Sequence, residues 1–217
     1  MRRLLLTLAL TSAACATTQL ARPVGRGNTR VSATLGGPLV KFGGAPVPLP
    51  ITTVGAAYGV SDLVDVHAEV HPTAAAFGIA GLSAGAALHP IASHRSALTI
   101  GASINAFGNG DDGVLFTDLW IAGGGRVARW LWLGGGLHNG LRMVGSATLR
   151  EQTAWAPTLF GLASFLVSRR VAIDVEARWY AMSSCGRCVA PDYYPIGDAG
   201  ALGLLLGVAY QFDGESR

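Results

Sequence analysis

The connections between the apolar segments of this chain alternate in length along almost the whole sequence. From Arg30 onward, ten segments alternate apolar residues with small or polar ones. The links after the even-numbered segments are short: Ser61–Leu63, Ile91–Ser96, Ala128–Arg129 and Ser168–Arg170. The links after the odd-numbered segments are longer, above all Met143–Ala154 and Met182–Ala199. Strands joined in sequence order place even links at one end and odd links at the other, so the pattern predicts an all-β, up-and-down antiparallel barrel.

The expected strands have the length needed to cross a bilayer. They cover roughly residues 30–40, 50–60, 64–71, 77–89, 97–107, 115–127, 130–142, 155–167, 171–181 and 200–212. Most run for about 9–11 residues, as a tilted transmembrane strand does. Two segments alternate poorly, so the pattern predicts about ten strands and leaves eight or twelve possible.

Composition favours a barrel with lipid around it. Charged residues make up 13% of the 217 residues, against about 25% in soluble domains. Hydrophobic residues reach 50%, yet no run of 18 apolar residues follows the N-terminus, which excludes a bundle of membrane helices. A net charge of +3 is too small to favour nucleic acid as a partner.

With these features the chain resembles the small bacterial outer-membrane β-barrel proteins over residues 30–212. The resemblance implies an integral outer-membrane location, short periplasmic turns, longer extracellular loops and outer-membrane lipid as a partner. The chain ends its last segment with Tyr210-Gln211-Phe212, which resembles the terminal aromatic signature read by the barrel insertion machinery. Residues 213–217 then form a short tail.

Polar residues share one face of two strands. In the third segment Val64, Val66, Ala68 and Val70 alternate with polar residues, and in the ninth Val171, Ile173, Val175 and Ala177 do the same. Because too few charges exist to coat a soluble exterior, we expect the polar face to line the lumen as one polar network: Asp65, His67, Glu69, His71, Asp174, Glu176 and Arg178. His67 and His71 lie about 13 Å apart on a strand, so no metal site is predicted.

Aromatic residues gather near the expected strand ends. One group falls near the short turns: Tyr58, Trp130, Trp132, Phe165, Tyr210 and Phe212. The other falls near the long loops: Phe77, Phe107, Phe116, Trp155, Trp179 and Tyr180. Two such groups are typical of the interfacial belts of a membrane barrel.

The N-terminus has the pattern of an export signal. A basic start and a short apolar stretch predict a signal peptide over residues 1–14. The Ser12-Ala13-Ala14-Cys15 sequence resembles the lipobox of bacterial lipoproteins, which implies lipidation of Cys15 and a tether over residues 15–29. Cleavage by ordinary signal peptidase after Ala16 is the alternative.

The remaining cysteines favour a disulfide. Cys185 and Cys188 lie in the longest loop, and pairing them would leave only Cys15 to explain. A redox centre would need a βαβ context, and zinc would need two further ligands. Asn109-Gly110-Asp111-Asp112-Gly113 lacks the spaced acids of a calcium loop and predicts a hairpin turn instead.

These observations predict a non-enzymatic outer-membrane barrel without catalytic residues or cofactors. It would be structural, or a narrow conduit for a small solute that the sequence does not identify. A surface-recognition barrel that binds a ligand through its disulfide-closed loop is the first alternative. An outer-leaflet hydrolase that uses a rim histidine, either His71 or His138, is the second, with Asp118 among the acids that could assist it.

Overall fold

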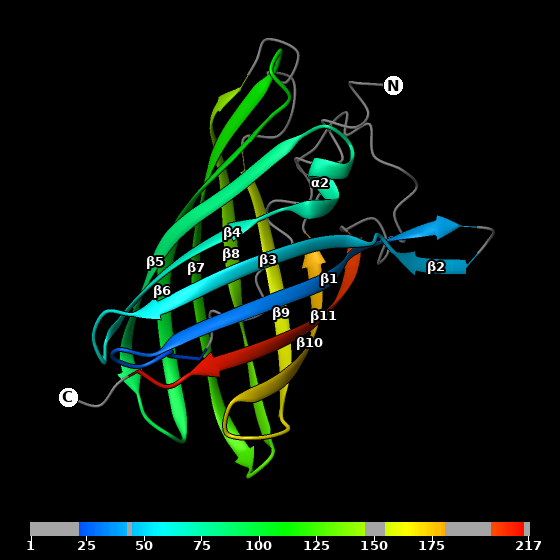
Figure 1. Cartoon of the computed structure of the whole chain (residues 1–217). Coiled ribbons are helices and arrows are strands. Elements are labelled where there is room, and N and C mark those ends of the chain that lie inside the picture. The colour runs from blue at the N-terminus through cyan, green and yellow to red at the C-terminus, as the bar shows by residue number, and fades with distance from the viewer. Residues whose placement is uncertain (1–21, 43–44, 146–154, 181–200, 215–217) are drawn as a thin grey trace.

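Ten antiparallel strands form a closed barrel in the computed structural model, which describes residues 22–42, 45–145, 155–180 and 201–214 (Figure 1). The barrel strands are β1 (Thr29–Phe42), β3 (Ile51–Gly59), β4 (Val64–Val70), β5 (Ala80–Ala92), β6 (Ser96–Gly108), β7 (Gly113–Ala128), β8 (Leu131–Gly145), β9 (Trp155–Leu166), β10 (Val171–Tyr180) and β11 (Ala201–Phe212). The all-β prediction and the count of ten strands are confirmed, and most boundaries agree within three residues.

The barrel closes where its first and last strands meet. Figure 1 shows β1 in blue and β11 in red side by side, although they come from opposite ends of the chain. The register runs without a shift from the pair Thr29 and Phe212 to the pair Pro38 and Gly203. Strand β1 also pairs with β3, so both of its edges are satisfied and no strand of the ring is left open.

The short links lie together at one end, as the sequence predicts. Four of them, between β3 and β4, β5 and β6, β7 and β8, and β9 and β10, contain two to four residues. The β6–β7 link is an exception on the opposite side, because only Asn109–Asp112 separate the strands. Asn109 Oδ1 accepts hydrogen bonds from the backbone of Asp111 and Asp112, and Gly110 has φ +92°, so this predicted turn is a tight hairpin.

Two small elements on the long-loop side escaped the sequence analysis. Strand β2 (Ala45–Pro48) pairs with the end of β1 and extends that hairpin beyond the barrel (Figure 1). Helix α2 (Pro72–Ala76) follows β4, with proline at its start, where a missing N–H costs no hydrogen bond. Strand β5 therefore begins three residues later than predicted. Among the described residues no helix is long and apolar enough to cross a bilayer.

The outer wall is apolar over most of its height. Outward residues between 38% and 55% exposed come from strands all around the ring: Val31, Leu35, Val54, Val66, Leu82, Ile100, Ile104, Ile121, Leu133, Leu159, Ile173, Leu204, Leu206 and Val208. At the short-turn end, an outward aromatic belt is formed by Tyr58, Trp130, Phe165, Tyr210 and Phe212. Within that belt Trp130 stacks on Phe165. A continuous apolar band with an aromatic rim is the surface that a bilayer requires of a barrel.

The predicted second belt is only partly present. Phe77 is exposed and Trp179 is half-buried, whereas Phe107, Phe116 and Tyr180 point inward and are buried. Trp132, which was expected in the short-turn belt, also points inward. The side chain of Trp155 lies outside the described residues. Successive residues of a strand face opposite sides, so proximity to a strand end does not determine which side an aromatic ring faces.

The closed barrel predicts a heat-modifiable protein. We expect unboiled protein to migrate differently from boiled protein on a denaturing gel, because all ten strands are joined in one ring of hydrogen bonds. Gel electrophoresis of matched samples with and without boiling measures this difference. Identical migration, together with solubility without detergent, would contradict the barrel.

Candidate functional site in the barrel lumen

The seven polar residues predicted for the lumen all lie on the inner side of β4 and β10 or just beyond β4. Five of them are buried: Asp65, His67, Asp174, Glu176 and Arg178. His71 is also buried and follows the end of β4, while Glu69 is half-buried and packs over Gly55 of β3. Period-two alternation therefore places these side chains together in one enclosed space.

Within this set, the structure brings together one ion pair. Arg178 Nε donates a short hydrogen bond to Glu176 Oε1, and both side chains are fully enclosed. Burial of each charge is costly, and their mutual attraction offsets part of that cost. His71 bonds instead to a residue outside the predicted set, because its Nε2 lies 2.9 Å from Ser83 Oγ of β5.

Asp65 pairs with a histidine that the sequence analysis did not select. His89 Nε2 on β5 donates to Asp65 Oδ2 over 2.8 Å, and His89 Nδ1 lies 2.9 Å from Thr99 Oγ1 on β6. Because an ionised carboxylate only accepts, this contact assigns a proton to Nε2 of His89. Three neighbouring strands are thus joined through side chains as well as through their backbones.

A second aspartate–histidine pair lies between β7 and β8. His138 Nδ1 donates to Asp118 Oδ2 over 2.8 Å, and both residues are buried. His138 also packs against Phe160 and stacks on Trp120. The sequence analysis named both residues separately, as possible parts of a rim site. Applying the inward and outward alternation of β4 to the neighbouring strands up to β7 and β8 would have placed Asp118 and His138 in the lumen.

Aromatic rings fill the space between the polar groups. Trp120, at 2% exposure, contacts His67 as well as His138, and Phe107 contacts His71 and stacks on Phe116. Gly101 lies beneath the Trp120 ring, where a Cβ atom would collide with the indole. This close approach gives one physical reason for glycine in the strand interiors of a filled barrel.

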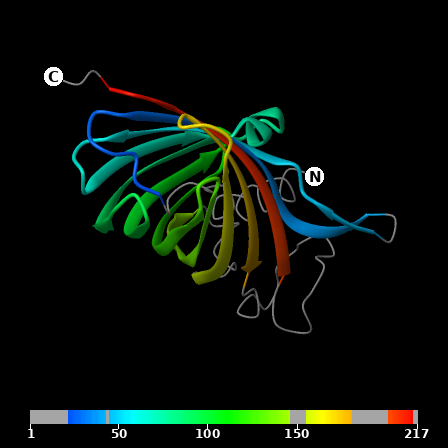
Figure 2. The ribbon, with the colours of Figure 1, turned by 90° about the horizontal axis from the view of Figure 1, so that it is seen from below.

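Residues 22–28 turn into the short-turn mouth of the barrel, and we call them the plug (Figure 2). They belong to the segment that the sequence analysis describes as a tether. Val24 is only 4% exposed, and its backbone N–H donates to Asp65 Oδ2 over 2.8 Å. Gly25 has φ +83°, and a Cβ on Gly59 would collide with the Gly25 carbonyl, so glycines permit this approach.

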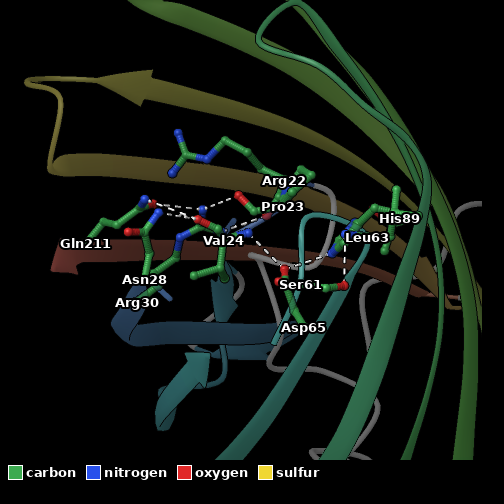
Figure 3. Close-up of polar contacts among 11 residues, drawn as sticks. Arg22, Pro23, Val24, Asn28, Arg30, Ser61, Leu63, Asp65, His89 and Gln211 are labelled. Atoms are coloured by element: carbon green, nitrogen blue, oxygen red, sulfur yellow. Dashed lines mark hydrogen bonds and ion pairs between the residues drawn. The ribbon is translucent and has the colours of Figure 1, made fainter. Parts of the chain in front are cut away.

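Side chains of the barrel hold the plug by its carbonyls. Arg30 donates to the carbonyls of Arg22 and Pro23, each over 2.8 Å, and Gln211 Nε2 donates to the Val24 carbonyl over 3.2 Å. Figure 3 shows Val24 between Gln211 and Asp65. Burial lowers the pKa of the Arg22 guanidinium, and the nearby carboxylate of Asp174 opposes that shift. The plug is therefore bonded to β1, β4 and β11.

On the side of the plug that faces β1 and β3 to β5, little free space remains. A cavity bounded by the plug and strands β1 and β3 to β5 has a volume of about 30 Å³, close to that of one water molecule. A larger hollow of about 610 Å³ is lined mainly by outward residues of β7 to β11, including Ile121 and Leu159, so it lies on the lipid side of the wall. In the described part of the chain, no group of three or more potential ligands could hold a metal ion.

The predicted cysteine sites lie outside the described residues. This applies to Cys15, the expected lipidation site, and to the expected disulfide between Cys185 and Cys188.

Comparisons with known proteins show resemblance at the level of the fold. No protein-family model and no curated protein matches the chain. An outer-membrane channel from Pseudomonas putida has a TM-score of 0.47 and 9% identity, over 86% of this chain and 96% of that one. The outer-membrane protease OmpT from Escherichia coli has a TM-score of 0.42 and 11% identity, over 85% and 97%.

An outer-membrane channel with a longer chain than this protein also resembles it only at the level of the fold. DcaP of Acinetobacter baumannii has a TM-score of 0.37 and 13% identity, over 88% of this chain but only 60% of that one. Similarity this limited carries no information about activity or substrate. The closed ring and the apolar outer wall nevertheless make this chain an integral β-barrel of the bacterial outer membrane.

The buried ion pair should be essential for stability. Glu176→Ala or Arg178→Ala leaves one charge enclosed without its partner, so we expect either change to lower the free energy of unfolding by about 3–5 kcal/mol. Urea titration of the protein in phospholipid vesicles measures the change. Asp62→Ala, which removes an exposed acid from the β3–β4 turn, should leave stability unchanged. Parent-like stability of both lumen variants would show that the pair contributes little.

Proposed function

We propose that this protein is a non-enzymatic outer-membrane barrel with a closed lumen, and that its role is structural. The observation that carries the proposal is the burial of the inward side chains. Trp120, His138, Glu176 and Arg178 come from three different strands, and none is more than 2% exposed. A water-filled channel would leave such groups accessible to solvent.

The closure has two layers along the barrel axis. Between the strands, aromatic rings and paired charges occupy the bore, which in a ten-stranded barrel is narrow to begin with. At the short-turn mouth, the plug enters the bore and is bonded to three strands. Passage of a solute would require movement of the plug and of several packed side chains, so we rank the narrow conduit below the structural role.

A lipid anchor at Cys15 belongs to the same proposal. Six residues separate Cys15 from Arg22, where the described plug begins. Seven extended residue steps span at most about 25 Å, which is sufficient for a chain leaving the mouth to reach the adjacent leaflet. The expected partners are outer-membrane lipid and the barrel insertion machinery, through the terminal Tyr210-Gln211-Phe212 sequence.

One observation favours a second candidate, an outer-leaflet hydrolase. His71 Nε2 and Ser83 Oγ are 2.9 Å apart, which is the separation of a base and the hydroxyl it activates. Both side chains are buried, however, and the ring of Phe107 lies against His71. His71 Nδ1 has no hydrogen-bond partner in the described part of the chain, so no carboxylate orients the imidazole there. We therefore place this candidate second.

The closed lumen predicts little or no conductance. In planar lipid bilayers we expect the parent protein to show no large, steady openings, because packed side chains fill the bore. Trp120→Ala should raise the conductance by removing the central ring. Trp130→Ala is the matched control, since it removes an outward indole and should leave the conductance as in the parent. Single-channel recording measures all three proteins.

Two outcomes would contradict the proposal. Steady conductance of the parent comparable with that of a porin would identify an open channel. Hydrolysis of lipid or peptide by the parent, lost on His71→Ala, would identify an enzyme.

Lipidation of Cys15 has a direct test. Cys15→Ala should abolish incorporation of a labelled fatty acid, because the thiol is the expected acceptor. The variant should still form a heat-modifiable barrel, since the strands begin at Thr29. Metabolic labelling followed by gel electrophoresis measures both properties. Label that persists in the variant would exclude Cys15 as the modified residue.

A further inference from the structure

A polar cavity lies in the short-turn mouth, between the plug and the barrel wall. Its volume is about 180 Å³, equal to that of roughly six water molecules. It is bounded by the plug, by β1 and β11, and by the turn between β9 and β10. Four arginines line it: Arg22, Arg30, Arg169 and Arg170. The cavity is separate from the paired charges at the centre of the lumen.

The positive charge around this cavity exceeds the negative charge. Arg170 forms an ion pair with Asp213 over 2.7 Å, so its charge is balanced. Asp174 acts on Arg22 and Arg30 through space, and Asp65 acts on Arg30, but in the described part of the chain neither carboxylate forms an ion pair with either arginine. Four arginines against the carboxylates of Asp65, Asp174 and Asp213 leave a local excess of one positive charge.

Arg30 is the residue that most favours an anion as the ligand of this cavity. Its side chain is only 3% exposed, and its hydrogen bonds go to two carbonyls and to the Gln211 amide oxygen. Its Nε has no hydrogen-bond partner among the described residues. A guanidinium buried without a bonded counterion is costly, and an anion in the adjoining cavity would reduce that cost.

Two further arginines that line the cavity, Arg22 and Arg169, have side-chain N–H groups that can donate to a ligand. Neither Arg22 nor Arg169 donates a side-chain hydrogen bond to another part of the described chain. Figure 3 shows the Arg22 side chain extending away from the plug contacts. These donors come from separate segments and can approach a ligand from several directions, which suits a tetrahedral oxyanion better than a planar carboxylate.

We propose that this cavity binds a phosphate group, with Arg22 and Arg169 as its principal donors and Arg30 as the buried charge behind them. The group comes either from free phosphate in the periplasm or from the headgroup of a phospholipid in the adjacent leaflet. The site would join the plug to the β9–β10 turn. It does not depend on whether the lumen conducts.

Inorganic phosphate and anionic lipid test the two sources separately. Calorimetric titration of the full-length protein in zwitterionic detergent should show phosphate binding at constant ionic strength. Arg22→Gln combined with Arg169→Gln should weaken it by at least about tenfold, the loss expected for one hydrogen bond to a charged group. Arg129→Gln is the control, because it removes one positive charge from an exposed turn residue that does not line the cavity. Arg30 is left intact because it holds the plug.

The second arm uses vesicles of phosphatidylcholine with and without phosphatidylglycerol, in buffer free of phosphate. The lipid headgroup is supported as the ligand if phosphatidylglycerol raises the free energy of unfolding of the parent but not that of the double variant, and if free phosphate does not bind. Binding of free phosphate that weakens only in the double variant supports the soluble anion. Absence of both effects, or equal losses in the double variant and in Arg129→Gln, would overturn the proposal.

Discussion

The antiparallel pairing of β1 with β11 is the interaction on which the rest of the structure depends. Without it, two strand edges would present unpaired backbone groups to the hydrocarbon core, where each unsatisfied group costs several kcal/mol. The pairing is continuous over ten residue pairs, from Thr29 and Phe212 to Pro38 and Gly203. Closure also creates an enclosed interior, and the inward side chains buried there must then satisfy one another.

The lumen meets this requirement by joining charges to partners on the same or a neighbouring strand and packing rings around them. Asp65 pairs with His89, Asp118 with His138, and Glu176 with Arg178. A single oxygen of Asp65 accepts from both His89 and the backbone of Val24. The same carboxylate therefore stabilises the wall and holds the plug, so the closed mouth and the filled centre are parts of one bonded arrangement.

Much of this fold could be predicted because the strands of a transmembrane barrel alternate residues that face lipid with residues that face the lumen. Alternation in β4 and β10 placed Val66 and Val175 outward and Asp65 and Glu176 inward, and the low charge content decided which face met lipid. The same alternation explains why some aromatic residues were wrongly placed in the interfacial belts. Phe107 and Tyr180 lie near strand ends, but their parity turns them inward, where glycines leave room for rings such as Tyr180 over Gly203. The tight β6–β7 hairpin was predicted from its own residues, an asparagine and a glycine, and not from the alternation.

The sequence by itself determined the strands, their order and the chemistry of each face, because these follow from period-two alternation and from the positions of turns. The tertiary structure alone decided which inward residues became partners. His89 meets Asp65 across 24 positions, and Gln211 meets Val24 across 187. Such contacts depend on the tilt and stagger of the closed sheet, which bring distant positions to the same level. The entry of residues 22–28 into the mouth has the same origin, because the carboxylate and arginine that hold the plug converge only after the ring has closed.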